Sequence, residues 1–174
     1  LAAARELVNG IKINTEKKLL EDFPKSAGFD YTKDQKRSIK EIFADLSSGR
    51  VMDRLLSGDV GFGKTEVAMN AMLAVVLDGF QALFICPTTL LASQHFHGIQ
   101  KRFSEFGIKV AKLDGKTSAK EKTSIKKALE NGDIQIVIGT HSLLSVKTKD
   151  LALVIIDEEH KFGVSVKDKL KTLK

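Results

Sequence analysis

A single glycine-rich segment limits what this chain can fold into more than any other feature. Residues 58–65, GDVGFGKT, fit the pattern G-x-x-x-x-G-K-[ST] of the phosphate-binding P-loop. Leu55 and Leu56 close a short apolar strand ahead of it. Residues 66–77 behind it are rich in Ala, Met, Leu and Val, as in a buried helix. The segment therefore predicts a strand, a tight glycine turn and a helix in succession.

The residue types in this turn suit a bound nucleotide. Glycines let backbone N–H groups converge on an anion without a Cβ in the way, and the following helix directs its positive end at the same point. Lys64 would reach the β- and γ-phosphates, and the Thr65 hydroxyl would ligate Mg²⁺. An ordinary glycine-rich turn is the alternative, because chance matches to the pattern are common. The residues predicted to contact the nucleotide are Gly58, Asp59, Val60, Gly61, Phe62, Gly63, Lys64, Thr65 and Glu66.

A second segment supports the nucleotide interpretation. Residues 151–156 form an unbroken apolar run, typical of a central strand in a parallel sheet, and Asp157-Glu158-Glu159-His160 follows directly. Three adjacent acids after a buried strand repel one another unless a cation compensates. We expect Asp157 to ligate a nucleotide-bound Mg²⁺ or its water shell, and Glu158 to act as general base on the attacking water. An acidic surface turn is the alternative, and the upstream P-loop disfavours it.

Length and composition fit one α/β domain. The chain has 174 residues, 43% of them hydrophobic, so it can bury a sizeable core. The single cysteine, Cys86, excludes a disulfide framework and is expected to be a reduced core thiol. No apolar run is long enough to cross a bilayer, and there is no signal-peptide pattern. Because the chain begins with Leu1, we expect it to be a piece of a longer protein.

The net charge of +6 is unevenly distributed. Residues 100–130 carry nine Lys or Arg against four acids, a bias that suits contact with a phosphate backbone. A solvated lysine-rich helix face over 118–130 explains the same bias equally well. Aromatic residues are scarce and tryptophan is absent, which disfavours recognition of single strands by base stacking.

The hydrophobic pattern predicts an alternation of strands and helices. Short helices are expected over 1–8 and 16–23, then a loop over 25–31, and then a helix from Thr32 to 47–49. Downstream of the P-loop, the predicted strands are 81–86, 109–113, 134–139 and 151–157, and the predicted helices are 89–105 and 118–131. Such repeated units predict a mainly parallel sheet with right-handed crossovers and helices on both faces.

Gln35 has two possible roles. Thr32-x-x-Gln35 forms a capping box, which satisfies the backbone at a helix start without any ligand. The Gln35 amide could instead read the edge of an adenine, with Phe29 or Tyr31 stacked on the base. The histidines show no metal-ligand spacing, and no metal beyond Mg²⁺ is assigned.

Two further loops are expected at the ligand-binding edge of the sheet. Residues 87–92 follow one predicted strand, and Thr88 or Thr89 would cap the next helix. Residues 139–141 follow another strand. Ordinary turn chemistry explains both loops, but their hydroxyls and free N–H groups could also contact phosphates along a nucleic acid.

Four motifs together resemble those of superfamily 2 helicases. GDVGFGKT, PTTLLASQH, IVIGTH and DEEHKFGV are similar to motifs I, Ia, Ib and II, and Gln35 resembles the adenine-reading glutamine ahead of motif I. The string MDRLLSGDVGFGKTEVA most resembles the motor of bacterial transcription-repair coupling factors. RecG branch-migration helicases look like close relatives, and residues 113–116 are more similar to theirs. The resemblance covers roughly residues 29–169.

This resemblance implies a fold and a function. Residues 29–174 would form the first RecA-like P-loop NTPase lobe, preceded by a helical linker over 1–28. The parent protein would be an ATP- and Mg²⁺-dependent translocase on double-stranded DNA. It would displace stalled RNA polymerase and recruit excision-repair proteins through other domains, in the cytoplasm. Lys64, Asp157 and Glu158 would be catalytic, while Glu159 and His160 would couple hydrolysis to motion. The DNA-facing residues would be Thr88, Thr89, Gln94, Gly139, Thr140 and His141.

The same resemblance implies that the motor is incomplete. The chain stops soon after motif II, whereas ATP in this family lies between two lobes, and the second lobe supplies arginines worth about 10³–10⁵ in rate in other NTPases. The chain alone is therefore expected to bind nucleotide weakly and hydrolyse it negligibly. A small-molecule P-loop kinase is disfavoured because the acids follow a strand far downstream. A non-catalytic nucleotide-dependent module is disfavoured because Lys64 and Glu158 are intact.

Overall fold

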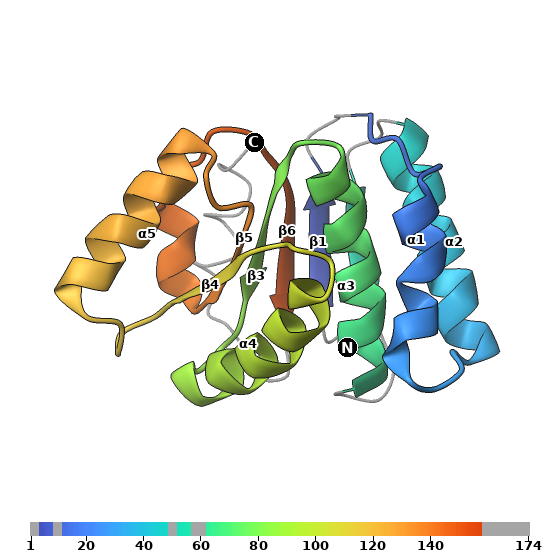
Figure 1. The fold of residues 1–174 in the computed structure, drawn as a ribbon, viewed down its shortest axis with the longest axis horizontal. Coiled ribbons are helices and arrows are strands. Elements are labelled where there is room, and N and C mark those ends of the chain that lie inside the picture. Colours follow the sequence, from blue (N-terminus) through green and yellow to red (C-terminus); the bar gives the residue numbers. More distant parts are fainter. Residues whose placement is uncertain (1–3, 9–11, 49–51, 57–61, 158–174) are drawn as a thin grey trace.

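Figure 1 shows one twisted sheet with helices packed against it. The computed structural model describes residues 4–8, 12–48, 52–56 and 62–157. The six strands lie in the order β2-β1-β6-β3-β5-β4 across the sheet. They are β1 (Ala4–Val8), β2 (Met52–Leu56), β3 (Gln81–Ile85), β4 (Val110–Leu113), β5 (Ile136–Gly139) and β6 (Leu151–Asp157).

The sheet is mainly parallel, as predicted. β3 pairs in parallel with both β5 and β6, and β4 pairs in parallel with β5. Only β1 among the described strands runs the other way, because it is antiparallel to β2 and to β6. β2 therefore points in the same direction as β6, and the strands other than β1 end at one edge of the sheet. Ligands of open α/β sheets bind outside this carboxyl edge.

Helices cover both faces of the sheet, because alternate side chains of its central strands enter two different cores. Alternate side chains of β3 belong to different cores: Ala82 and Phe84 pack with α2, α3 and α4, whereas Leu83 and Ile85 pack with α5 and η2. The helices are α1 (Lys18–Asp22), η1 (Pro24–Ala27), α2 (Lys33–Ser48), α3 (Phe62–Leu77), α4 (Thr89–Ser104), α5 (Ala119–Asn131) and η2 (His141–Ser145). The predicted helices and strands downstream of the P-loop are confirmed to within about two residues.

The start of α2 confirms the predicted capping box. The Thr32 N–H donates to Gln35 Oε1 at 2.8 Å, and the Gln35 N–H donates to Thr32 Oγ1 at 3.1 Å. Ile42 and Leu46, four residues apart on one face of α2, are fully buried, and α2 packs against α3. Sequence spacing alone determined which face of this helix enters the core.

The amino-terminal segment differs from its predicted helix. Residues 4–8 form β1, a strand inserted between β2 and β6 and hydrogen-bonded to both. Helix propensities differ by only a few tenths of a kcal/mol per residue. Pairing of residues 4–8 with a strand on each side outweighs so small a preference, so the predicted helix is wrong here. A helix is present further along, at Lys18–Asp22. Ile13 and Phe23 are buried in the main core, so residues 13–23 pack against the rest of the domain.

Candidate nucleotide and DNA site

The carboxyl edge of the sheet gathers most of the predicted site. α3 begins at Phe62, so Gly63, Lys64 and Thr65 occupy its first turn. Asp157 is the last residue of β6. Gly58, Asp59, Val60 and Gly61 of the glycine turn lie outside the described residues, as do Glu158, Glu159 and His160. The roles predicted for these seven residues stay predictions.

Thr65 and Asp157 meet on opposite sides of one imidazole. Thr65 Oγ1 lies 3.4 Å from His95 Nδ1, and Asp157 Oδ2 lies 3.0 Å from His95 Nε2. The side chains of His95 and Asp157 are 13% and 8% exposed, so this contact is largely shielded from water. The structure thus brings Thr65, at the end of the P-loop pattern, and Asp157, the last residue of β6, into contact with the same imidazole ring.

This donor set fits a magnesium ion carried by a nucleotide. A hydroxyl and a carboxylate are hard oxygen ligands of the kind that Mg²⁺ prefers, and Mg²⁺ commonly takes one or two protein ligands together with substrate phosphates and waters. Within the part of the chain that the structure describes, no group of three or more His, Cys, Asp or Glu forms a metal site of its own. Because the imidazole lies between the two oxygens, one Mg²⁺ could contact only one of them directly, and phosphates and waters would complete its coordination.

His95 is the site residue that sequence reasoning missed. Its spacing from the other histidines fits no metal site, so the sequence assigns it no role. Its helical position does single it out, because His95 lies three residues after Ala92 and four before Ile99, both fully buried on α4. It therefore occupies the buried stripe of its helix, where its ring packs 5.1 Å from that of Phe84. A histidine within an apolar stripe indicates a polar partner in the interior.

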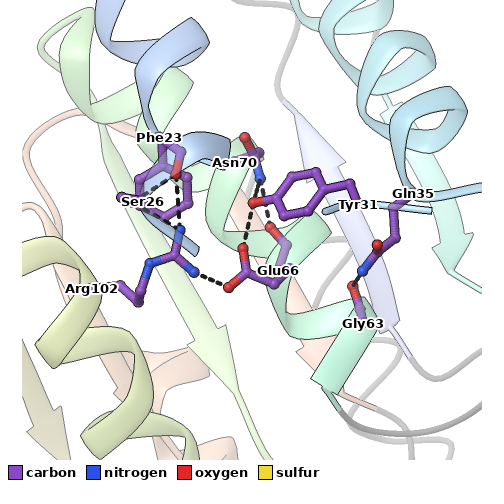
Figure 2. Close-up of polar contacts among 8 residues, drawn as sticks. All are labelled: Phe23, Ser26, Tyr31, Gln35, Gly63, Glu66, Asn70 and Arg102. Carbon is purple, nitrogen blue, oxygen red and sulfur yellow. Dashed lines mark hydrogen bonds and ion pairs between the residues drawn. The ribbon is translucent and has the colours of Figure 1, made fainter. Parts of the chain in front are cut away.

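Gln35 links the start of α2 to the start of α3. Its Oε1 accepts the capping bond from Thr32, and its Nε2 donates to the Gly63 carbonyl at 3.2 Å (Figure 2). A Cβ added at Gly63 would lie 3.1 Å from the same Nε2 atom. The glutamine therefore packs directly on the phosphate-binding turn, and reading of an adenine edge stays a prediction.

Glu66, predicted to contact nucleotide, has its side chain directed into the protein instead. Figure 2 shows its carboxylate accepting hydrogen bonds from Arg102 and from the Tyr31 hydroxyl, and its exposure is 1%. Asn70 completes the cluster by donating to Tyr31 Oη at 3.1 Å and to the Glu66 carbonyl at 2.8 Å. Any contact between Glu66 and a phosphate would therefore come from its backbone.

Phe29 lies near this cluster and remains partly accessible. Its ring is 5.8 Å from that of Tyr31, and the residue is 37% exposed, whereas Tyr31 is buried with its hydroxyl engaged. Phe29 lines both a cavity of about 750 Å³ beside α2 and a cavity of about 590 Å³ beside α3 and α4. Of the two aromatic residues, Phe29 has the larger exposed surface for a stacked base, and that role stays a prediction.

Four of the predicted DNA-facing residues line one cavity of about 440 Å³: Thr88, Thr89, Thr140 and His141. The register explains their meeting, because Ile85 pairs with Gly139, which in turn pairs with Leu113 at the ends of β3, β5 and β4. Gly139 lies against this backbone so closely that an added Cβ would be 2.0 Å from the Leu113 carbonyl oxygen.

Two lysines of α5 join this cavity, whereas two of the predicted residues, Gln94 and Gly139, are not part of its lining. Lys122 and Lys126 line it, one helical turn apart, together with Asp114. Gln94 lines the cavity of about 590 Å³ beside Thr65 instead. Thr88 also caps α4 as predicted, because its hydroxyl accepts from the Leu91 N–H at 3.2 Å.

Comparison with known proteins agrees with this arrangement. The family model described as DEAD/DEAH box helicase matches residues 32–174. The chain is 55% identical over 173 residues to the transcription-repair-coupling factor of Helicobacter pylori strain J99, covering 99% of this chain and 17% of the relative. It is 49% identical over 168 residues to the ATP-dependent DNA helicase RecG of Thermotoga maritima, covering 95% of this chain and 22% of the relative.

A solved structure, RecG bound to a three-way DNA junction, matches 82% of this chain and 20% of that chain with a TM-score of 0.76 and 48% identity. The predicted RecA-like fold is thereby confirmed. The chain spans about a fifth of the length of these relatives. On the family match and the shared fold, the chain belongs to the DEAD/DEAH box helicases.

Proposed function

We propose that this chain is the ATP-binding lobe of a DNA-dependent ATPase that translocates on double-stranded DNA in transcription-coupled repair. The observation that carries the proposal is the meeting of Thr65 and Asp157 on one imidazole. A P-loop hydroxyl that ligates a nucleotide-bound Mg²⁺ and a strand-end carboxylate that acts on the ion or its water shell are the protein groups that such a site needs. The similarity to transcription-repair-coupling factors supports the biological role.

The residues of this lobe divide the chemistry among them. Lys64, in the first turn of α3, neutralises the β- and γ-phosphates, Thr65 ligates the magnesium, and Asp157 acts on the ion or its water shell. Bound Mg²⁺ neutralises charge that develops on the phosphates during transfer. Glu158 orients the attacking water, and Glu159 and His160 couple hydrolysis to motion. A second RecA-like lobe of the same chain would supply the arginine that completes the site.

DNA would bind at the cavity beside β3, β4 and β5. Its lining of hydroxyls and two lysines suits phosphate oxygens, and no Phe, Tyr or Trp is among its described lining residues. Backbone contact without base reading is what a motor needs in order to move along any sequence. Contacts with RNA polymerase and excision-repair proteins would come from other domains, and such a motor on bacterial DNA works in the cytoplasm.

A RecG-like helicase lobe acting on branched DNA is the second candidate. It is favoured by the structure match to RecG at 48% identity and by the RecG relative at 49%. Both candidates use the same ATP chemistry, so the parent protein must be assayed to separate them. Displacement of a stalled RNA polymerase supports the first, whereas preferential unwinding of a three-way junction supports the second.

The first experiment measures nucleotide binding by the 174-residue chain. We expect it to bind a fluorescent ATP analogue weakly in the presence of Mg²⁺, to lose that binding in Lys64→Ala, and to show negligible turnover with double-stranded DNA. A longer polypeptide that includes a second lobe should hydrolyse ATP in a DNA-dependent manner. Binding that does not depend on Lys64 would refute the proposed site. Robust DNA-stimulated hydrolysis by the chain alone would refute the need for a second lobe.

A further inference from the structure

We propose that Asp114 is a charge-balancing residue of the DNA cavity, which limits how tightly that cavity holds the phosphates of double-stranded DNA. The DNA cavity is the one of about 440 Å³ at the ends of β3, β4 and β5, and Asp114 is the acidic residue among its described lining residues. The inference rests on the proposed function, because it assumes that DNA binds there. It adds a residue that acts on DNA through its charge, without a direct contact.

The turn after β4 holds Asp114 in the wall of the cavity. Asp114 directly follows β4, whose last residue, Leu113, pairs with Gly139 at the carboxyl edge of the sheet. Its Oδ1 accepts a hydrogen bond from the Lys116 N–H at 2.8 Å, and its own N–H donates to Thr117 Oγ1 at 3.0 Å. These bonds close the turn, so the carboxylate has little freedom to move out toward water.

The second carboxylate oxygen of Asp114 is not used by the turn. Oδ2 is buried and has no hydrogen-bond partner among the described residues, and the side chain is 1% exposed. Lys112 Nζ lies 3.8 Å away, which is longer than a hydrogen bond, on a side chain that is 31% exposed. Lys112 therefore offsets only part of the charge. Because a buried charge is screened less than an exposed one, the negative potential of an ionised Asp114 extends into the cavity.

This negative potential opposes that of two cations in the same lining. Lys122 and Lys126 of α5 attract phosphates, whereas Asp114 repels them. A cavity that only had to hold a phosphate would bind it better without the buried carboxylate. A motor that moves along DNA must also release each phosphate, and a balanced charge favours release.

A purely structural role for Asp114 makes a different prediction. If the residue only closes the turn, Asp114→Asn should leave DNA affinity unchanged, because an asparagine keeps an oxygen acceptor for the Lys116 N–H and suits the same turn. The charge-balancing role requires this substitution to strengthen DNA binding. The substitution therefore separates the charge of Asp114 from its part in the turn.

The experiment measures binding of a fluorescein-labelled double-stranded oligonucleotide by anisotropy at several salt concentrations. We expect Asp114→Asn to bind about 3- to 10-fold more tightly at about 0.1 M salt and to steepen the slope of log affinity against log salt by up to about one, since each neutralised phosphate contributes about one to that slope. The matched control is Asp133→Asn, which makes the same change of charge at an exposed residue ahead of β5, and it should match the wild type.

A second pair of variants tests the partial compensation by Lys112. Lys112→Met leaves the carboxylate of Asp114 without its neighbouring cation, so it should weaken DNA binding more than Lys109→Met does. Lys109 is exposed and precedes β4, so it lies toward the opposite end of that strand. Urea unfolding of every variant confirms that folded proteins are being compared.

Two results would overturn the inference in different ways. Unchanged or weaker DNA binding by folded Asp114→Asn, while charge reversal at Lys122 and Lys126 weakens binding, would overturn the charge-balancing role alone. Full DNA binding after reversal of both lysines would instead overturn the placement of DNA in this cavity, and this inference with it.

Discussion

Mutations that break the buried ion pair between Glu66 on α3 and Arg102 on α4 should strongly lower the free energy of unfolding. Glu66 is 1% exposed and Arg102 is 13% exposed on their side chains, and the two are in direct contact. Arg102 also donates to the Phe23 carbonyl at 3.1 Å and to Ser26 Oγ at 3.3 Å, and its guanidinium lies 4.2 Å from the Phe23 ring centre. It therefore joins residues 23–26 to the residue that follows Thr65.

Arg102→Met keeps most of the aliphatic stem and removes the charge. Glu66 is then left almost fully buried, with the Tyr31 hydroxyl as its remaining described donor. Breaking a buried pair in this way costs about 3–5 kcal/mol, because an uncompensated charge remains in the interior. Since domains of this kind are stable by about 5–15 kcal/mol, the variant should lose a large fraction of its free energy of unfolding.

Glu66→Gln removes the other charge and should cost less. Arg102 keeps the Phe23 carbonyl, Ser26 and the Phe23 ring as partners, so the loss is that of a charge-assisted hydrogen bond, about 1.5–3 kcal/mol. In the double variant no charge remains buried, and its cost should fall short of the sum of the two by about 1–3 kcal/mol.

Urea unfolding followed by far-ultraviolet circular dichroism measures these free energies. The control is Arg37→Met, which breaks an exposed pair with Asp34 whose side chains are 70% and 84% exposed, and which should change stability by less than about 1 kcal/mol. The reasoning is refuted if Arg102→Met costs no more than Arg37→Met, or if the effects of Glu66→Gln and Arg102→Met simply add.

Two further predictions concern the DNA cavity and the glycines. Reversing the charge of the two α5 lysines that line the cavity should weaken binding to double-stranded DNA and lower the slope of log affinity against log salt by about two, as measured by fluorescence anisotropy at several salt concentrations. The same reversal at two exposed lysines of α5 outside the cavity should have a clearly smaller effect, and equal effects would contradict a specific contact. The pairs are Lys122 with Lys126 and, as control, Lys120 with Lys127. Gly139→Ala should prevent stable folding, because its Cβ would lie 2.0 Å from a backbone oxygen, whereas Gly98→Ala, in open space on α4, should raise the free energy of unfolding by about 0.5–1 kcal/mol. Thermal unfolding checks both glycine variants, and a stable Gly139→Ala protein would contradict the close approach of β4 and β5.

Much of the fold could be predicted from the sequence because its signals are local. The apolar runs at 82–85 and 151–156 became buried parallel strands, since a strand covered on both faces needs apolar side chains on both sides. The capping box at Thr32 and Gln35 formed because both of its bonds join residues three apart. Likewise, the carboxyl-edge position of Asp157 followed from strand order and direction alone.

The contacts that decide the site are not local, and only the tertiary structure supplied them. His95 reaches residues 30 and 62 positions away, and Glu66 meets Arg102 from 36 positions away. β1 was predicted as helix because its identity as a strand depends on β2 and β6, which follow it in the chain. A sequence encodes each side chain's chemistry and periodicity, whereas which distant groups share a buried position depends on how the elements pack.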